Sequence, residues 1–326
     1  MVENVDFVIC LLALLSLNVE VQKTLKKPKS SQDGDSSKIF KHKKYRECIR
    51  KLDLVNDTLV ELGISKEYDK ERTMIKWSLI SWFIIVCLTN TFDGLLFLTQ
   101  NNMKVSDLII PWILQYSVHI NTLHDLTIMY MLRYIGNRLD KINDHIVQLS
   151  ENENCGLRCM WKKSLTVSRR YGRNTEYRKH VLWTAMHLHF ELCWIARNIN
   201  FFYGVQMTVQ MASYFVGFLT LLYFQYRSLL CLFHVYESNK TIWMLALSTD
   251  MWTIFFLVKF VSLNHICESV CYKAEKTRTV IHRLTNLLYF ANMHDMIYQF
   301  GLQILLHPLK FSGMGLFYYS YKFIRS

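Results

Sequence analysis

Four apolar segments of the chain are long enough to cross a lipid bilayer as single helices. They cover residues 75–99, 108–132, 201–224 and 241–265. A helix needs about 20 predominantly apolar residues to span the hydrocarbon core. Helices also satisfy their own backbone hydrogen bonds, as a membrane segment must. The pattern therefore predicts an all-α, polytopic helical membrane protein.

Two shorter apolar runs lie near the ends of the chain. The first, within residues 1–19, is too short for an ordinary spanning helix. It could be the core of a secretory signal, which Glu3 and Asp6 disfavour because such signals begin with basic residues. At the other end Pro308 ends a short amphipathic helix, and residues 311–326 are interpreted as the start of a final membrane helix.

Three of the segments that flank the four spans are polar and basic, and they cover residues 20–74, 133–200 and 266–310. Residues 28–37 predict a flexible centre in the first of them. Apolar residues recur at helical spacing in Leu52, Val55, Leu59 and Leu62, in Leu139, Ile142, Ile146 and Leu149, and in Leu188, Leu192, Ile195 and Ile199. The stripes predict helices that pack on one another within the chain, associate between subunits, or do both.

Charge fixes the expected orientation of the spans. The formal net charge is +12, and Lys and Arg gather in these three segments, whereas residues 100–107 and 226–240 have few of them. Basic loops of membrane proteins remain in the cytoplasm, so these three segments are predicted to lie inside the cell. The sequon at Asn239 then faces outward and is a predicted glycosylation site, whereas the sequon at Asn56 faces inward. No basic stripe interleaved with aromatic residues points to nucleic acid as a partner.

Polar side chains inside the spans are the candidates for function, because a charge in hydrocarbon costs at least about 2.5–3.5 kcal/mol. Polar and aromatic groups in the outer halves could form a small-molecule pocket open to the outside. The competing interpretation places the aromatic residues in an interfacial belt and Asp93 at a helix end. Lys259 is expected to extend toward the cytoplasmic face. The candidate ligand-binding residues are Asp93, Gln115, Tyr116, His119, Tyr214, Asp250 and Trp252.

No motif supports an enzyme, a metal site or a cofactor. The sequence contains no nucleophile elbow, no P-loop, no Rossmann glycine pattern and no HExxH motif. His119 and His124 are five positions apart and do not share a helix face well. Cys155 with Cys159, and Cys267 with Cys271, have a spacing that could bind zinc, but neither has a clear second pair. The nine cysteines are expected to be reduced thiols.

The end of the chain resembles the C-terminal part of insect gustatory receptors, a seven-helix chemosensory family. The family's pattern runs F-x-L-Q-h-h and then F-x-x-x-G-h-F, where h is apolar. The first block is matched by Phe300, Leu302 and Gln303, and the second by Phe311, Gly315 and Phe317. A third block of the family, T-Y followed by five apolar residues and Q-F, is absent.

The resemblance implies a taste-ligand-gated cation channel subunit in the plasma membrane of chemosensory neurons. It implies a small-molecule tastant, a surrounding lipid bilayer and a homo- or hetero-tetramer with other gustatory receptors. In such a protein residues 1–19 correspond to a partial transmembrane segment and residues 266–310 to cytoplasmic anchor helices. The resemblance thus implies an inverted seven-helix architecture whose first and last helices are missing or partial in this sequence. The alternative is a non-conducting regulatory or degenerate subunit that lacks the pore helix. An unrelated transporter is disfavoured, because the spans show no internal repeat.

Overall fold

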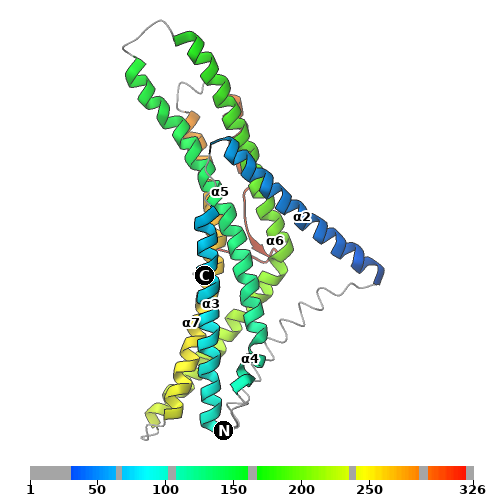
Figure 1. Ribbon diagram of the computed structural model, residues 1–326, viewed down its shortest axis with the longest axis vertical. Helices are drawn as coiled ribbons and strands as arrows, with labels where there is room; N and C mark the ends of the chain where they lie inside the picture. The colour runs from blue at the N-terminus through cyan, green and yellow to red at the C-terminus, as the bar shows by residue number, and fades with distance from the viewer. Residues whose placement is uncertain are drawn as a thin grey trace. The chain divides into compact units, whose positions relative to one another are not determined.

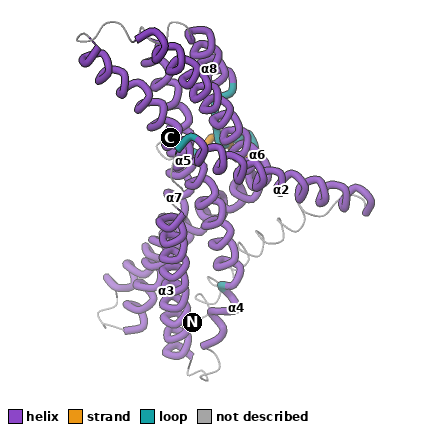
Figure 2. Tube along the Cα trace, turned by 45° about the horizontal axis from the view of Figure 1, so that its top comes forward, coloured by secondary structure: helices purple, strands orange, loops and turns teal. Residues whose placement is uncertain are grey.

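The computed structural model describes residues 31–63, 68–101, 108–160, 167–234, 240–285 and 293–320, and it is built of helices with one small hairpin (Figures 1 and 2). The predicted all-α class is confirmed. The partial segment expected in residues 1–19 and the sequon at Asn239 lie outside the described residues. The elements are α2 (Ser31–Glu61), α3 (Tyr68–Asn101), α4 (Ile110–Leu114), α5 (Tyr116–Met160), α6 (Val167–His234), α7 (Lys240–Thr285), α8 (His294–Leu306), β1 (Ser312–Gly313) and β2 (Phe317–Tyr318).

Three helices contain segments that are long and apolar enough to cross a membrane, counted over the described residues. The segments are Lys70–Leu96 in α3, Glu176–Leu230 in α6 and Ile242–Leu284 in α7. The last two are far longer than the roughly 20 residues that a bilayer requires. These helices therefore continue beyond the hydrocarbon, as the apolar stripes in the polar segments predicted.

The remaining predicted span, residues 108–132, is not one continuous helix. Pro111 opens the short helix α4, which ends at Leu114, and α5 begins at Tyr116. Two backbone hydrogen bonds connect α4 to α5. The Gln115 N–H donates to the Pro111 carbonyl at 2.8 Å, and the His119 N–H donates to the Gln115 carbonyl at 3.1 Å. Gln115 therefore lies at the junction between α4 and α5.

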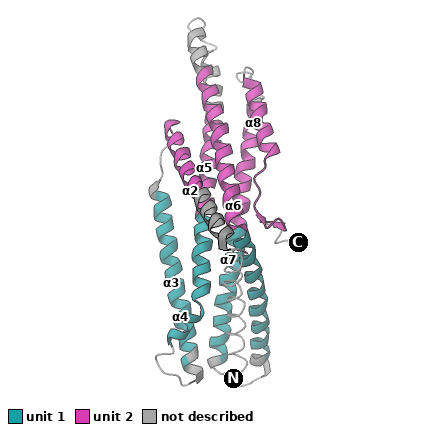
Figure 3. Cartoon of the chain, turned by 90° about the vertical axis from the view of Figure 1, so that its right-hand side faces the viewer, with its two compact units in different colours: residues 1–37, 67–130, 205–264 teal, residues 38–66, 131–204, 265–326 magenta. Residues whose placement is uncertain are grey.

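The chain packs as two compact units, each with its own core (Figure 3). Unit 1 contains residues 1–37, 67–130 and 205–264, and unit 2 contains residues 38–66, 131–204 and 265–326. Unit 1 is apolar outside and partly polar inside. Phe83 and Leu88 on α3 are each 59% exposed, whereas Asn90 and Gln210 are fully buried. That distribution suits a helical bundle surrounded by lipid, where polar groups turn inward.

Unit 2 has an aliphatic core formed by the predicted stripes. Val55 and Leu59 of α2 are buried, as are Leu139, Ile142 and Ile146 of α5 and Leu188, Leu192, Ile195 and Ile199 of α6. Packing within the chain therefore accounts for these residues. Two ion pairs border this core, joining Lys51 to Glu191 at 2.8 Å and Lys273 to Asp140 at 2.6 Å.

The end of the described chain corrects the expected final helix. Residues 312–318 form a two-stranded hairpin in which Ser312 pairs with Tyr318, and Gly313 with Phe317. Its turn needs left-handed backbone at Met314, with φ of 53°, and at Gly315, with φ of 78°. A regular right-handed helix does not accommodate such residues, so residues 312–318 are not helical, and residues 321–326 of the predicted final segment lie outside the described residues. The predicted flexible centre at residues 28–37 is also wrong from Ser31 onward, where α2 is already helical.

Candidate functional site

Asp93 of α3 is the centre of a buried hydrogen-bond cluster in unit 1. Its Oδ1 accepts from the Ser248 hydroxyl at 2.7 Å, and its Oδ2 accepts from the Gln115 amide at 2.7 Å and the Trp252 indole at 3.0 Å. An ionised carboxylate accepts on both oxygens and has no proton to donate, which is the form that three donors select. Gln115, at the junction between α4 and α5, contacts Asp93 from one side, and Ser248 and Trp252 contact it from one face of α7.

A second polar pair lies on the same face of α3. Asn90 is three positions before Asp93, so both side chains lie on one side of the helix. The Asn90 amide donates to the Val86 carbonyl at 2.9 Å and contacts Nε2 of His119 at 3.0 Å. Because an amide N–H can only donate, Nε2 accepts and the His119 ring is neutral with its proton on Nδ1. The Asn90 side chain is fully buried and His119 is 8% exposed.

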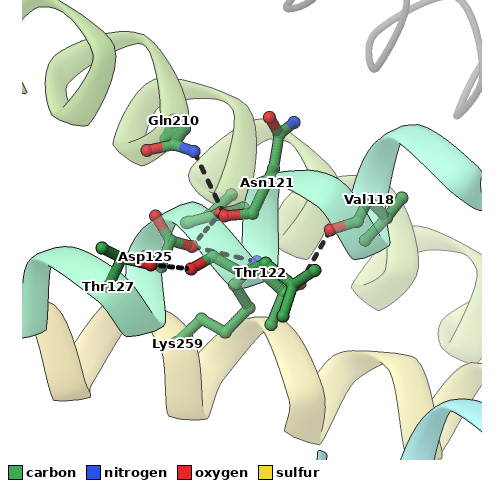
Figure 4. Close-up of polar contacts among 9 residues, drawn as sticks. Val118, Asn121, Thr122, Asp125, Thr127, Gln210 and Lys259 are labelled. Atoms are coloured by element: carbon green, nitrogen blue, oxygen red, sulfur yellow. Dashed lines mark hydrogen bonds and ion pairs between the residues drawn. The ribbon is translucent and has the colours of Figure 1, made fainter. Parts of the chain in front are cut away.

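A third cluster joins α5, α6 and α7 around a buried ion pair (Figure 4). The Lys259 ammonium lies 3.1 Å from Asp125 Oδ2 and donates to the Thr122 hydroxyl at 2.9 Å. The Tyr214 hydroxyl donates to the same Asp125 oxygen at 2.5 Å. Lys259 also lies over the ring of Tyr214, 4.3 Å from its centroid.

The position of Lys259 corrects the expectation that it extends toward the cytoplasmic face. It is 8% exposed and turns into unit 1 against Asp125, which is 3% exposed. Opposite charges attract more strongly in a medium of low dielectric constant, and the pair also satisfies an aspartate that hydrocarbon could not solvate. Asp250 does not pair with Lys259; its partner is the amide of Gln225.

The seven predicted site residues divide among several places in unit 1. Asp93, Gln115 and Trp252 converge on one cluster. His119 pairs with Asn90, and Tyr214 belongs to the ion-pair cluster. Tyr116 is 65% exposed, and Asp250 is exposed beside Gln225. Three of the seven predicted residues therefore share one cluster, two belong to other buried clusters, and two are exposed.

Sequence reasoning missed Ser248 and Asn90 as partners of the predicted residues. Ser248 is four positions before Trp252, and Asn90 is three before Asp93, so helical spacing from a predicted site residue could have found both. It also missed that Asp125 and Lys259 belong together. The signal was available in principle, because they carry opposite charges in different apolar helices.

Unit 2 contains a separate cavity of about 480 Å³ between α6, α7, α8 and the hairpin. Its walls include His189, Cys193 and Cys271, and the Cys193 sulfur lies 3.8 Å from Nε2 of His189. Cys193 and His189 of α6 thus approach the helix that carries Cys271. Even so, no group of three or more potential ligands in the described part of the chain has the arrangement that a metal ion requires.

Comparison with known proteins adds one family match. The model of the 7tm chemosensory receptor family matches residues 37–326. The matched range takes in residues of both units, including the three clusters of unit 1. Among curated proteins, none matches the chain.

Proposed function

The chain belongs to the 7tm chemosensory receptor family, and from this premise we propose that it is a gustatory receptor, a cation channel subunit that opens when a taste ligand binds. Family membership makes it a membrane chemoreceptor and places it outside the enzyme families. The finer assignment is supported by the resemblance of residues 300–317 to the gustatory pattern, with Phe300, Gln303 and Gly315 at its defining positions.

The observation that carries a ligand site is the convergence of three helical segments on Asp93. Burying a carboxylate in an apolar bundle costs desolvation free energy, and apolar side chains in its place would give an equally stable or more stable protein. The cluster is therefore not explained by stability alone. A ligand that exchanges hydrogen bonds with Asp93, Gln115 or Trp252 would favour one arrangement of α3, α5 and α7 over another. Such differential affinity is what moves a receptor between closed and open states.

The proposed setting is the plasma membrane of an insect chemosensory neuron, with the basic segments in the cytoplasm. The positive-inside pattern supports this orientation, which puts Asp93 and Trp252 nearer the outside. Assembly with other receptor subunits as a tetramer is supported by exposed apolar side chains near the end of the described chain. These are Tyr298, Leu305 and Leu306 on α8 and Leu316 in the hairpin, which are 56% to 78% exposed.

Calcium imaging of cells that express the full chain tests the proposal. The chain is expressed alone and with other gustatory receptors, and a panel of tastants is applied with and without extracellular calcium. A ligand-gated channel gives a signal that requires extracellular calcium, whereas receptor-coupled release from stores does not. Binding without calcium entry under every combination would contradict the channel and favour the non-conducting subunit.

A matched pair of variants connects the signal to the cluster. Trp252→Phe keeps an aromatic ring but removes the indole donor that Asp93 accepts. Tyr223→Phe removes a hydroxyl from a side chain that is 57% exposed. Tastant sensitivity is expected to fall about tenfold in the first variant, consistent with loss of one hydrogen bond to a charged group, and to stay unchanged in the second.

A further inference from the structure

The apolar spans of unit 1 carry an excess of negative charge. Across residues 77–101, 108–130, 205–226 and 242–264 the sequence has three aspartates, Asp93, Asp125 and Asp250, no glutamate, and one Lys or Arg, Lys259. Charges buried in hydrocarbon are retained where they have a partner or a function. Asp250 is exposed beside the Gln225 amide, which leaves Asp93 and Asp125 as the two buried carboxylates.

Asp125 and Asp93 are compensated in different ways. Asp125 faces the Lys259 ammonium at 3.1 Å, so its charge is already neutralised by a cation. Asp93 is 8% exposed and, among the described residues, accepts only from neutral donors, the amide of Gln115, the hydroxyl of Ser248 and the indole of Trp252. Hydrogen bonds stabilise the carboxylate but leave its net charge in place, so a cation that entered the cluster would be attracted to Asp93.

In the described part of the chain, the unpaired polar atoms of Gln115, Asn90 and His119 are two acceptors and one donor, the donor being the Nδ1–H of His119. The Gln115 Oε1 and Asn90 Oδ1 atoms are buried without a hydrogen-bond partner among the described residues. Their orientation is fixed, because the Gln115 amide nitrogen donates to Asp93 and the Asn90 amide nitrogen donates to the Val86 carbonyl. A flip of either amide would break that bond, so each oxygen remains an acceptor and needs a donor from elsewhere.

Aromatic rings lie beside the same carboxylate. Trp252, which donates to Asp93, contacts Phe255 with ring centroids 5.5 Å apart and Phe256 with centroids 6.0 Å apart. Indole faces attract organic cations through their quadrupole, more strongly when water is excluded. The cluster thus combines an uncompensated carboxylate, unpaired acceptors and an aromatic wall.

We propose that the ligand of this site is a protonated amine on an aromatic or aliphatic body, with its ammonium group at Asp93. The inference rests on the ligand site proposed above and names its chemical class. A neutral polyol would satisfy the acceptors but leave the charge of Asp93 in place. A carboxylate ligand would be repelled. Asp125 does not compete for the ammonium, because Lys259 already occupies that position.

Four probes of similar size separate charge from hydrogen bonding. They are 2-phenylethylamine, which is a cation with N–H donors, 2-phenylethanol, which is neutral with one donor, propylbenzene, which has neither, and 3-phenylpropanoate, which is an anion. Each competes with tritiated 2-phenylethylamine for the purified full chain in lipid nanodiscs, and direct binding of a tritiated form of each is also measured. The amine is expected to bind at least about tenfold more tightly than the alcohol, and the anion most weakly.

Variants then assign the charge preference to one residue. Asp93→Asn removes the carboxylate with little change of shape and is expected to weaken amine binding about tenfold while changing alcohol binding little. Asp144→Asn, at an exposed position of α5 in unit 2, makes the same change of net charge and is expected to have no effect. If the Asp93→Asn variant does not fold, the ranking of the four probes on the unaltered chain still decides the question.

Each contrary result has its own meaning. Equal binding of the amine, the alcohol and propylbenzene would overturn the cationic ligand class and leave the ligand site standing. Equal loss of amine binding in both variants would overturn the role of Asp93 and point to general electrostatic attraction. Absence of binding by all four probes, in both assays, would overturn the ligand site itself and the inference with it.

Discussion

A lysine ammonium and an aspartate carboxylate, both withdrawn from solvent, face each other in unit 1. Lys259 of α7 and Asp125 of α5 are each less than a tenth exposed, and Thr122 and Tyr214 supply further hydrogen bonds. Removing one partner of such a pair leaves the other charge buried without compensation, which costs more than the pair contributes. The two residues should therefore depend on each other.

Asp125→Asn and Lys259→Met, made singly, are expected to destabilise the protein by about 3–5 kcal/mol each. The double variant removes both charges and is expected to unfold at a higher temperature than either single variant. Thermal unfolding of the purified chain in nanodiscs, followed by tryptophan fluorescence, measures the order of the three midpoints. Additive losses in the double variant would show that the two charges do not interact.

An exposed pair provides the control for this prediction. Lys179 and Glu176 lie 3.2 Å apart on α6, with side chains that are 40% and 76% exposed. Water screens such pairs, and they contribute at most about 1 kcal/mol. Lys179→Met is therefore expected to leave the unfolding midpoint almost unchanged.

Composition and spacing selected Asp93, Gln115 and Trp252, which the structure brings together, but did not select Ser248. Asp93 could be selected because a charged group within an apolar helix is rare. Ser248 could not be selected in the same way, because serine in a membrane helix usually bonds to its own backbone. Which residues of α3 and α7 meet depends on the rotation of each helix, and a single sequence does not contain that information.

At the scale of elements, periodicity predicted helices well and their interruptions poorly. Most of the stripe residues in α2, α5 and α6 are buried as predicted, although Leu52 and Leu62 of α2 are half-buried and Leu149 lies outside the residues whose burial the structure describes. The break at Gln115 and the hairpin at residues 312–318 depend on a few backbone angles. Residues 311–326 have the apolar composition of a membrane helix, but the glycine at position 315 also permits the left-handed backbone of the hairpin turn.

The same substitution at two glycines should change stability in opposite directions. A Cβ added to Gly301 of α8 or to Gly315 of the hairpin would meet nothing within 4 Å. Gly301 is helical, so Gly301→Ala is expected to stabilise the chain by about 0.5–1 kcal/mol through helix propensity. Gly315 has φ of +78°, so Gly315→Ala is expected to destabilise it by about 1–2 kcal/mol.

Thermal unfolding of both alanine variants measures this contrast, and Gly136→Ala adds a third case. A Cβ at Gly136 of α5 would lie 3.2 Å from Cγ2 of Val270 on α7. Crowding there should cancel the gain in helix propensity that Gly301→Ala shows. A stabilised Gly315→Ala variant would mean that the hairpin turn adopts another backbone conformation.

At the scale of the whole molecule, orientation rests on the distribution of basic residues and on the two sequons. Asn239 falls in a segment with few basic residues, and Asn56 falls in a basic one. The structure adds an independent reason for Asn56 to remain unmodified. Its side chain is 6% exposed within unit 2, and its Oδ1 accepts from the Tyr134 hydroxyl at 2.8 Å.

Glycosylation in cells is therefore expected at Asn239 and not at Asn56. The full chain should show one shift in gel mobility that glycosidase removes, that Asn239→Gln abolishes and that Asn56→Gln preserves. Thr241→Ser should keep the glycan and Thr241→Ala should lose it, because the sequon needs a hydroxyl at its third position.

An epitope tag inserted within residues 161–166 should bind antibody only after permeabilisation, and a tag within residues 102–107 should bind it on intact cells. Staining of the first tag on intact cells would reverse the orientation, and would place Asp93 and Trp252 on the side of the membrane that an external tastant does not reach.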